Sequence, residues 1–437
     1  MGIQNFPAAL QPIIQQGFLQ REFQSGLQSR LGFRAIADRE DFPNKIGETI
    51  TKTRKGLKAP VETPLNPTTN TNLDNGLTPS GWTVEQYTLG INMYGDTIDL
   101  NMVTQGVGIA KQFAANAKTN GVQAMQSLDR IARNVLYAGY LGGNTRVRTT
   151  LGAPATTVAV DDIRGFQYVM VNGVMVPVSS SNPMTVTVGA GVYQLTGATP
   201  DGSNVSTAPK GVSGTLQFSA NVSTSDGTAG NGVVSAVAPV VLRTNGRAST
   251  AALQAGDTLQ MQDCLSAVAT LRSNNVPDIN GLYNCYLDDK QLLGLFKDPD
   301  FKLLYRGAYG SETYKTGQII ELLGLRFIPT NEAPQQASLG AGAIHRALIC
   351  GQGALVEGDY VSTGYSDIPE AQKGLIEMVD AVCMVTREPL DRLQQIIAQS
   401  WYWIGGFALP TDVTANANII PTATNSYLKR GVVIESL

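Results

Sequence analysis

Two adjacent segments constrain the fold of this chain more than any other feature. An extended segment from Lys45 to Asp99 is followed directly by a helical stripe from Leu100 to Tyr140. In the stripe, small apolar residues recur at alternating spacings of four and three, the period of one helical face. They are Val103, Val107, Ala110, Ala114, Ala117, Gly121, Ala124, Leu128, Ile131 and Val135. One helix of this length would reach about 60 Å, far beyond the usual helix of about 11 to 12 residues. We expect a bend or a break at Asn120-Gly121, because Gly costs about 1 kcal/mol relative to Ala in a helix. Two ordinary helices in a bundle are the alternative.

The segment before the stripe has the alternation of β-strands. Tyr87, Leu89, Ile91 and Met93 are predicted to share one face, and residues 46–57 form a weaker partner strand. The loop between them, 59–81, is rich in Pro, Asn and Thr and holds too little apolar surface to order itself. Such a long loop is uncommon inside a compact domain. It is therefore either disordered or ordered by something outside the subunit.

Composition excludes several classes of protein. With 437 residues, 43% of them hydrophobic, the chain has material for two to three domains with real cores. A net charge of -3 argues against a protein whose main task is to grip nucleic acid by its phosphates. No apolar run approaches the length of about 18 residues that a membrane span needs, so no membrane partner is predicted. The first residues lack the pattern of a secretory signal, which favours a cytoplasmic location before release, and residues 1–44 are predicted to form an amphipathic arm.

The sequence offers little for catalysis or for metal binding. Its four cysteines are widely spaced and are predicted to be buried free thiols, with a disulfide as the less favoured alternative. The single histidine, His345, makes neither a zinc site nor a recognisable triad. Adjacent carboxylates at 288–289 are interpreted as a helix start, and those at 161–162 as a turn. We therefore predict no catalytic, cofactor-binding or metal-binding residue and no cofactor. A glycosidase with two carboxylates from distant positions stays open.

The composition changes between Gly152 and Asp257. Only nine charged residues occur there, and turn signals such as Asn172-Gly173 and Asp201-Gly202 separate short predicted strands. These strands include residues 165–171, 173–178, 184–188, 214–219 and 233–242. This pattern predicts an all-β module, a small sandwich or barrel. It looks inserted, because helical periodicity resumes immediately afterwards and ends near 273–275. One face of this predicted helix is lined by Leu259, Cys264, Ala267, Val268 and Leu271.

From Val276 onward the pattern is mixed α/β. It predicts strands at 282–287, 324–329, 347–350, 375–386 and 400–409, and a helix at 288–296 that stops before Asp298-Pro299. Residues 390–397 fit either a short helix or part of a long strand. Trp401 and Trp403 make one face of the last long strand aromatic, for which core packing is the default explanation and subunit contact the second.

The order of these segments resembles the major capsid protein of tailed bacteriophages, with the Hong Kong 97 type fold. Three stretches carry the resemblance: LRSNNVPDINGLYNCYLDDKQLLGLFKDPDF, YKTGQIIELLGLRFIPTNEAP and SWYWIGGFALPTDVTANANIIP. The resemblance covers about residues 45–150 and 259–437, and the β-module departs from it. It implies an α+β fold with an N-terminal arm, an extended β-hairpin loop, a long spine helix, and peripheral and axial α/β domains.

Domain boundaries follow from this resemblance. They are 1–44 for the arm, 45–99 for the extended hairpin loop, 100–151 with 258–275 for the peripheral domain and spine helix, 152–257 for the inserted all-β domain, 276–400 for the axial domain, and 401–437 for C-terminal strands that return to the peripheral domain.

The resemblance also implies a function and partners. The expected function is self-assembly, as hexamers and pentamers, into the icosahedral shell of a virion that is assembled in the bacterial cytoplasm and encloses double-stranded DNA held by non-specific contact. A portal, a separate scaffolding protein and a decoration protein are the expected partners, and no cleavage of the N-terminus is expected because no acidic helical leader precedes the arm. The alternative is a secreted or virion-associated β-rich protein that is carbohydrate-active or adhesive.

Candidate intersubunit contacts are Lys52, Arg54, Lys55, Lys58, Trp401 and Trp403. The four basic residues crowd one arm of the predicted hairpin. On an isolated domain they would form a solvated strand edge that discourages unwanted pairing. In a shell they would meet carboxylates of a neighbour, so we expect their replacement by Glu to leave a folded subunit that fails to close shells.

Overall fold

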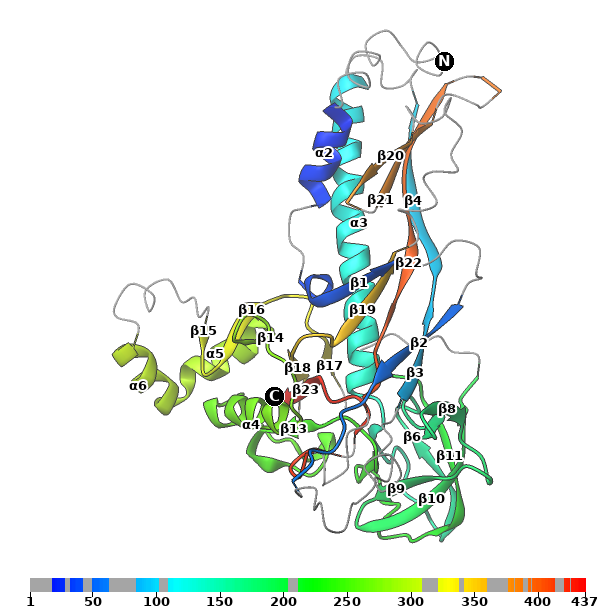
Figure 1. Ribbon diagram of the computed structural model, residues 1–437, viewed down its shortest axis with the longest axis vertical. Helices are drawn as coiled ribbons and strands as arrows, with labels where there is room; N and C mark the ends of the chain where they lie inside the picture. Colours follow the sequence, from blue (N-terminus) through cyan, green and yellow to red (C-terminus); the bar gives the residue numbers. More distant parts are fainter. Residues whose placement is uncertain are drawn as a thin grey trace, which may run out of the picture. The chain divides into compact units, whose positions relative to one another are not determined.

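The computed structural model describes most of the chain (Figure 1). The described residues are 18–27, 32–41, 49–62, 84–101, 109–202, 211–308, 321–337, 342–359, 376–380, 382–387, 392–393, 395–412, 420–424 and 426–437. Most of the loop predicted at 59–81, the first 17 residues of the arm, and Val103 and Val107 of the helical stripe lie outside them. The chain divides into two compact units: residues 1–51, 88–133 and 355–408 form unit 1, and residues 52–87, 134–354 and 409–437 form unit 2.

Unit 1 is a six-stranded sheet with a helix along it (Figure 1). The strand order is β1-β19-β22-β21-β20, and β4 pairs with β22 along the other edge. Their bounds are β1 Ala37–Asp41, β4 Asn92–Asn101, β19 Leu355–Asp359, β20 Ile376–Val379, β21 Val382–Arg387 and β22 Ile396–Ala408. Helix α2, Phe18–Leu27, adds Phe23 to the core of the unit. Strand β1 belongs to this sheet, so residues 37–41 of the predicted arm are part of a folded unit.

Helix α3, Ile109–Tyr140, is the long helix that the stripe predicts. It is one continuous helix of 32 residues, so no break occurs at Asn120-Gly121, while the bend expected there as the other outcome stays a prediction. The Asn120 side chain is buried, and its Nδ2 donates to the carbonyl of Gln399 at 3.0 Å, which ties this point of the helix to β22. The predicted start at Leu100 is also wrong, because Leu100 lies in β4. Phe113, Ala117, Ala124, Met125 and Leu128 pack against Trp401, Trp403 and Ile397 of the sheet.

The alternation predicted for 87–93 changes at Ile91. In β3, Val84–Gly90, the side chains of Glu85, Tyr87 and Leu89 are buried, but Met93 in β4 is 71% exposed. The expectation that Met93 shares the face of Tyr87 is therefore wrong. Gly406 lies against this point, because a Cβ there would come within 1.8 Å of the Gly90 carbonyl oxygen. The close approach of two backbones ends one strand and starts the next with the opposite parity.

In unit 2, strands from residues 144–235 build a six-stranded antiparallel sheet of order β5-β12-β9-β10-β11-β6. Their bounds are β5 Asn144–Arg146, β6 Ala155–Val160, β9 Met184–Val188, β10 Gly191–Pro200, β11 Gly214–Val222 and β12 Gly232–Ser235. The sheet closes on itself, because Val147 bridges Val160 and the Arg148 N–H donates to the Ala159 carbonyl at 2.8 Å. It is a small barrel around a core that includes Val158, Val186 and Leu216.

A separate hairpin, β7 Tyr168–Val171 and β8 Val174–Pro177, follows the predicted turn at Asn172-Gly173. Both turn residues have positive φ, 49° and 81°, as a two-residue hairpin turn requires. The strands predicted around 165–178, 184–188 and 214–219 are thus confirmed, whereas β6 and β10 were not among the strands named. The single strand predicted at 233–242 is wrong, because β12 ends at Ser235 and a strand of another sheet, β13 Val241–Arg243, begins at Val241.

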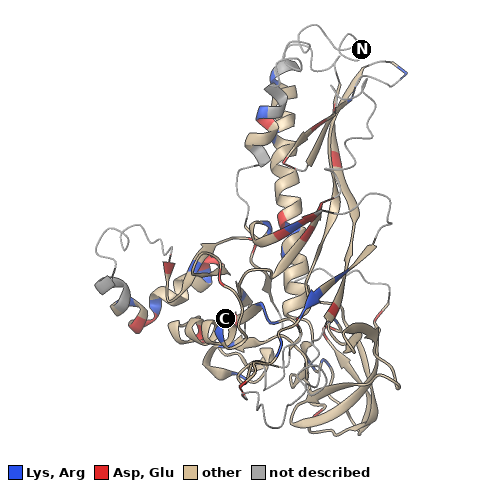
Figure 2. Ribbon diagram, in the orientation of Figure 1, with Lys and Arg blue, Asp and Glu red and all other residues tan. Residues whose placement is uncertain are grey.

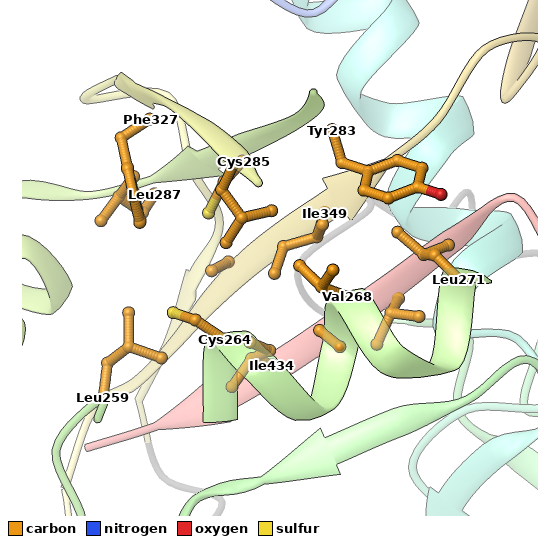
Figure 3. Packing of buried hydrophobic residues seen from close by; sticks show 14 of the residues in the cluster. Leu259, Cys264, Val268, Leu271, Tyr283, Cys285, Leu287, Phe327, Ile349 and Ile434 are labelled. Atoms are coloured by element: carbon orange, nitrogen blue, oxygen red, sulfur yellow. The ribbon is translucent and has the colours of Figure 1, made fainter. Parts of the chain in front are cut away.

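The other sheet of unit 2 has seven strands, and helix α4 packs on it (Figure 3). Its order is β13-β23-β18-β14-β16-β15, with β17 on β18. The bounds are β13 Val241–Arg243, β14 Tyr283–Leu287, β15 Glu321–Leu322, β16 Leu325–Pro329, β17 Gln335–Gln336, β18 Ile344–Cys350 and β23 Gly431–Ser436. Helices α4 Met261–Ser273, α5 Asp289–Lys297 and α6 Pro299–Ala308 complete it. Cys264, Val268 and Leu271 of α4 point at the sheet, as their spacing predicts (Figure 3).

Two strand predictions need correction in detail. The single strand expected over 375–386 is a hairpin, since Asp380 has a φ of +47° and separates β20 from β21. Residues 396 and 397, for which helix and strand both stayed open, belong to β22. Within the described residues, no helix is long and apolar enough to cross a membrane.

Candidate intersubunit surface

The predicted basic cluster lies on β2, Thr49–Lys55, and the residues that follow it. Strand β2 pairs with β3 and alternates regularly between exposed and half-buried side chains. Lys52 and Arg54 are half-buried, whereas Lys55 and Lys58 are exposed. Figure 2 shows the basic colour on this strand. Because successive side chains of a strand point to opposite faces, the four cations do not form one surface.

Arg54 stands apart from the three lysines. Its Nη1 is buried and has no hydrogen-bond partner among the described residues. Burial and, second, the charge of Arg430 lower the pKa of Arg54, while Asp412 acts in the opposite direction. All of these residues belong to unit 2. Arg54 is therefore held inside the subunit, a placement that the basic run alone could not reveal.

Trp401 and Trp403 lie in the core of unit 1, which is the default explanation given for them. They are 3% and 0% exposed. The Trp401 Nε1 donates to Gln123 Oε1 at 3.1 Å, and the ring of Trp403 stacks on Tyr94 and Phe407. Because both indole rings are buried in this conformation, neither presents a surface to a partner. Contact of Trp401 and Trp403 with another subunit therefore stays a prediction.

Sequence reasoning missed other exposed features. Strand β4, residues 92–101, pairs with β22 alone among the described strands, so it forms an edge of the sheet as far as the structure describes it. Large apolar side chains are also exposed on two helices of unit 2: Leu293 on α5 is 53% exposed and Leu303 on α6 is 76% exposed. The sequence could have indicated these two leucines, because helical spacing places Leu293 and Leu303 off the apolar face of their helices that packs on the sheet.

The four thiols and the single histidine are all buried. All four cysteines are free and buried, as predicted. Burial raises the pKa of the Cys264 and Cys350 thiols to about 12, so the reactive thiolate is suppressed. His345 is buried and its Nδ1 contacts the carboxylate of Asp288, which also caps α5 by accepting from the Gln291 N–H at 2.8 Å. No group of three or more His, Cys, Asp or Glu side chains suited to a metal ion occurs within the described ranges.

Unit 2 also contains a small polar cavity of about 40 Å³. Its arginines are paired with carboxylates: Arg146 with Asp161 at 2.5 Å, Arg164 with Asp162 at 2.7 Å, and Arg243 and Arg346 with Glu435 at 3.0 and 3.1 Å. The volume is far below the roughly 300 to 1,000 Å³ of a typical ligand pocket. These ion pairs therefore suit a structural junction between β5, β6 and the seven-stranded sheet.

Comparison with solved structures identifies the fold. The capsid structure of the cyanophage P-SCSP1u matches over 93% of this chain and 88% of that chain, with a TM-score of 0.50 and 8% sequence identity. The capsid asymmetric unit of the cyanophage Pam1 matches over 93% of this chain and 92% of that chain, with a TM-score of 0.50 and 12% identity. No protein-family model and no curated protein matches the chain. At these identities the likeness establishes the fold, which is that of phage capsid proteins.

Proposed function

We propose that this chain is the major capsid protein of a tailed bacteriophage and that it self-assembles into the icosahedral shell around a double-stranded DNA genome. The observation that carries the proposal is the fold likeness to two phage capsids over 93% of the chain. A match of this extent includes both units, so it is not the likeness of one common module.

The local structure supports the Hong Kong 97 type of this fold. The paired strands β2 and β3 form the base of the extended hairpin loop, and α3 is the spine helix. The six-stranded sheet of unit 1 corresponds to the peripheral domain. In this proposal, α5, α6 and strands β14 to β18 belong to the axial domain of residues 276–400, α4 belongs to the peripheral domain, and the barrel is the inserted all-β domain. Exposed elements such as the outer edge of β4 gain partners in an assembly.

The proposed partners follow from the same role. Copies of the chain form hexamers and pentamers, and a portal, a separate scaffolding protein and a decoration protein complete the particle. The net charge of -3 suits non-specific contact with packaged DNA, because a strongly basic lining would hold the genome tightly. The protein acts in the virion after assembly in the host cytoplasm and has no enzymatic activity; the buried thiols and the paired histidine support this last point.

Purified protein tests the proposal directly. We expect the full chain, expressed with or without its scaffolding protein, to sediment as large particles that electron microscopy shows as closed or partial shells. A matched control is the same preparation in denaturant, followed by dilution, which should regenerate particles in a concentration-dependent manner. A monomer that stays monomeric at high concentration, and that binds carbohydrate, would favour the β-rich adhesive alternative and overturn the capsid assignment.

A further inference from the structure

Five Asn-Gly pairs occur within the described residues, and they share one reactive sequence. The backbone nitrogen of the glycine can attack the side-chain carbonyl of the asparagine, because glycine has no Cβ to hinder the approach. The attack requires that the asparagine carboxamide can turn and that the glycine N–H is not hydrogen-bonded. The five asparagines are Asn120, Asn172, Asn231, Asn245 and Asn280, and a sixth pair, 75–76, lies outside the described residues.

At three of these pairs the asparagine carboxamide is held. Asn120 is buried within helix α3, and its Nδ2 donates to a carbonyl of β22. The Asn231 Nδ2 donates to two backbone carbonyls at 2.9 Å each. The Asn245 Nδ2 donates to Asp257 Oδ1 at 2.7 Å. Each carboxamide must break these hydrogen bonds before it can turn toward the next residue, so the structure slows the attack at all three.

The two remaining pairs differ at the glycine nitrogen. The Gly281 N–H donates to Asp278 Oδ1 at 3.0 Å, so the nucleophile next to Asn280 is held. Asn172 is exposed, and within the described part of the chain neither its side chain nor the Gly173 N–H has a hydrogen-bond partner. Among the five described pairs, both reacting groups are therefore free only at Asn172.

The hairpin that contains Asn172 also allows its backbone to move. Strands β7 and β8 pair with each other and with no other described strand, and a sheet of two strands is marginally stable. Tyr168 and Val174 are 51% and 42% exposed, so little apolar burial holds the hairpin closed. In the closed turn Asn172 has a φ of +49°. Local opening gives it access to the extended conformations in which the glycine nitrogen reaches the carboxamide carbon.

We propose that Asn172 is a site of spontaneous deamidation. The Gly173 nitrogen forms a bond to the Asn172 side-chain carbonyl carbon, the bond from that carbon to the side-chain nitrogen breaks, and ammonia leaves with the proton that the Gly173 nitrogen gives up. One water molecule then opens the resulting cyclic imide at either carbonyl and yields isoaspartate or aspartate. No oxidant or reductant takes part, and the proposal does not rest on the proposed capsid function.

The modification changes a turn that lies against β3. The Gln86 N–H donates to the Gly173 carbonyl at 2.8 Å, and a Cβ on Gly173 would come within 2.2 Å of the Val84 carbonyl oxygen. Isoaspartate routes the main chain through the side-chain carbons and so lengthens the backbone of the turn. A turn in such close contact cannot keep its place when its backbone lengthens. Deamidation at Asn172 therefore loosens the first residues of β3, the strand that pairs with β2.

The first part of the test compares rates within one protein. The full-length chain is incubated at mildly alkaline pH, native and in denaturant, and peptide mass spectrometry follows the deamidated fraction at each of the five asparagines. In denaturant the five rates should be similar, because every site is followed by Gly. In the native protein Asn172 should react about tenfold faster than each of the others, because an intact hydrogen bond at a reacting group raises the barrier by an amount of this order. A native rate at Asn172 no higher than that at the other four would overturn the proposal.

A matched variant tests the structural reason for the difference. Asp278 is exposed, and Asp278→Ala removes the acceptor of the Gly281 N–H. We expect this variant to deamidate faster at Asn280 and at an unchanged rate at Asn172. An unchanged rate at Asn280 would show that the glycine hydrogen bond does not control the reaction.

The products and the state of β3 complete the test. The cyclic imide predicts isoaspartate together with aspartate at position 172, whereas aspartate alone would indicate direct hydrolysis and overturn the proposed route. The Gln86 amide should exchange its hydrogen faster in aged protein than in fresh protein. The control is fresh Asn172→Asp, which carries the new charge on a backbone of normal length and should exchange at Gln86 like the fresh wild type. Equal exchange at Gln86 in aged and fresh wild type would refute the loosening of β3.

Discussion

A single buried ion pair fixes the start of β1 to the sheet of unit 1. Arg34 and Glu357 are 4% and 0% exposed, and the Arg34 Nη2 lies 2.5 Å from Glu357 Oε1, with its Nε at 3.0 Å from Oε2. Asp129 of α3 accepts from the backbone N–H groups of Gly32 and Arg34. The guanidinium also lies 5.9 Å from the ring centre of Trp403. Residues 32–41 therefore belong to the folded unit through side chains as well as through strand pairing.

We predict that Glu357→Gln strongly destabilises unit 1. The substitution keeps the shape of the side chain but leaves the buried Arg34 charge uncompensated, which typically costs about 3 to 5 kcal/mol. Urea unfolding of the subunit measures the loss. The control is Arg326→Gln, which removes a pair with Glu321 whose side chains are 35% and 48% exposed, and should cost less than about 1 kcal/mol. Equal effects of the two variants would contradict the prediction.

The lowered pKa of Asp257 leads to a prediction of how the free energy of unfolding changes at acidic pH. Its carboxylate accepts from Arg247 Nε at 2.9 Å, from the Gln254 N–H at 2.8 Å and from Asn245 Nδ2 at 2.7 Å. The Arg247 hydrogen bond contributes most to a pKa of about 2, against an ordinary value of 3.8. Because the folded-state pKa is depressed, this contribution is fully present above the unfolded-state value and is lost as the pH falls from about 4 to about 2.

The measurement is the unfolding free energy of the wild type and of Asp257→Asn between pH 6 and pH 2. We expect the difference between the two proteins to be constant above pH 5 and to shrink as the pH approaches 2. A difference that does not change with pH would show that Asp257 acts through packing and not through its charge.

At the scale of secondary structure, α3 shows how a tertiary contact overrides local propensity. Asn120-Gly121 is a poor helical pair, yet the helix continues through it. The buried Asn120 amide satisfies the Gln399 carbonyl, which lies inside β22. Asn120, which is next to Gly121 of the apolar stripe, thus forms a hydrogen bond to the sheet.

We predict that Asn120→Ala destabilises the subunit although Ala is the better helix former. The gain in helix propensity is about 0.5 kcal/mol, whereas the lost hydrogen bond from the Asn120 Nδ2 to the Gln399 carbonyl contributes about 0.5 to 1.5 kcal/mol. Thr119→Ala is the matched control, because Thr119 is exposed and its hydroxyl only donates back to the Ala115 carbonyl. Chemical denaturation should show a loss for Asn120→Ala and little change or a small gain for Thr119→Ala. The opposite order would refute the role of Asn120.

The barrel predicts where an autonomous fragment must begin. Strand β5 pairs with β12, and the buried Val147, 1% exposed, bridges to Val160. Strand β5 and Val147 are thus part of the barrel, although they precede the boundary at residue 152 that the change in composition suggests. We expect a fragment of residues 142–238 to fold alone, whereas residues 152–257 lack the strand that closes the barrel. Amide dispersion in NMR spectra of the two fragments tests this. Good dispersion for 152–257 alone would mean that β5 is dispensable.

The sequence predicted those elements whose pattern is local. Two such predictions are confirmed: the buried face of α4 with Cys264, Val268 and Leu271, and the turn at Asn172-Gly173. Both could be predicted because helical periodicity and positive φ depend on residues that are close in sequence. Sequence prediction failed where distant residues decide the outcome. The change of strand parity at Ile91 depends on Gly406, and the burial of the Arg54 Nη1 has no sign in the basic run. Pairing between segments hundreds of residues apart leaves no local signature in one sequence.

At the scale of the whole molecule, the basic run on β2 divides into two roles. Arg54 is half-buried and is influenced by residues of its own unit, so its replacement would test packing together with assembly. Lys55 and Lys58 are exposed and Lys52 is half-buried. The three lysines are therefore the better test of contacts between subunits. Arg54 is left out of the four-residue substitution by Glu that the sequence suggests.

We predict that Lys52→Glu, Lys55→Glu and Lys58→Glu together leave a folded subunit that fails to close shells. Each exposed ion pair contributes only about 0 to 1 kcal/mol, but a shell repeats the same interface many times, so the effects sum. The Gln version of the triple variant removes attraction without adding repulsion and should assemble at an intermediate level. Wild-type assembly should slow as salt rises, because the Debye length falls from about 10 Å at 0.1 M to about 3 Å at 1 M. Circular dichroism checks the fold, and light scattering with electron microscopy checks assembly. Normal particles from the Glu variant at low salt would show that these lysines form only a solvated strand edge.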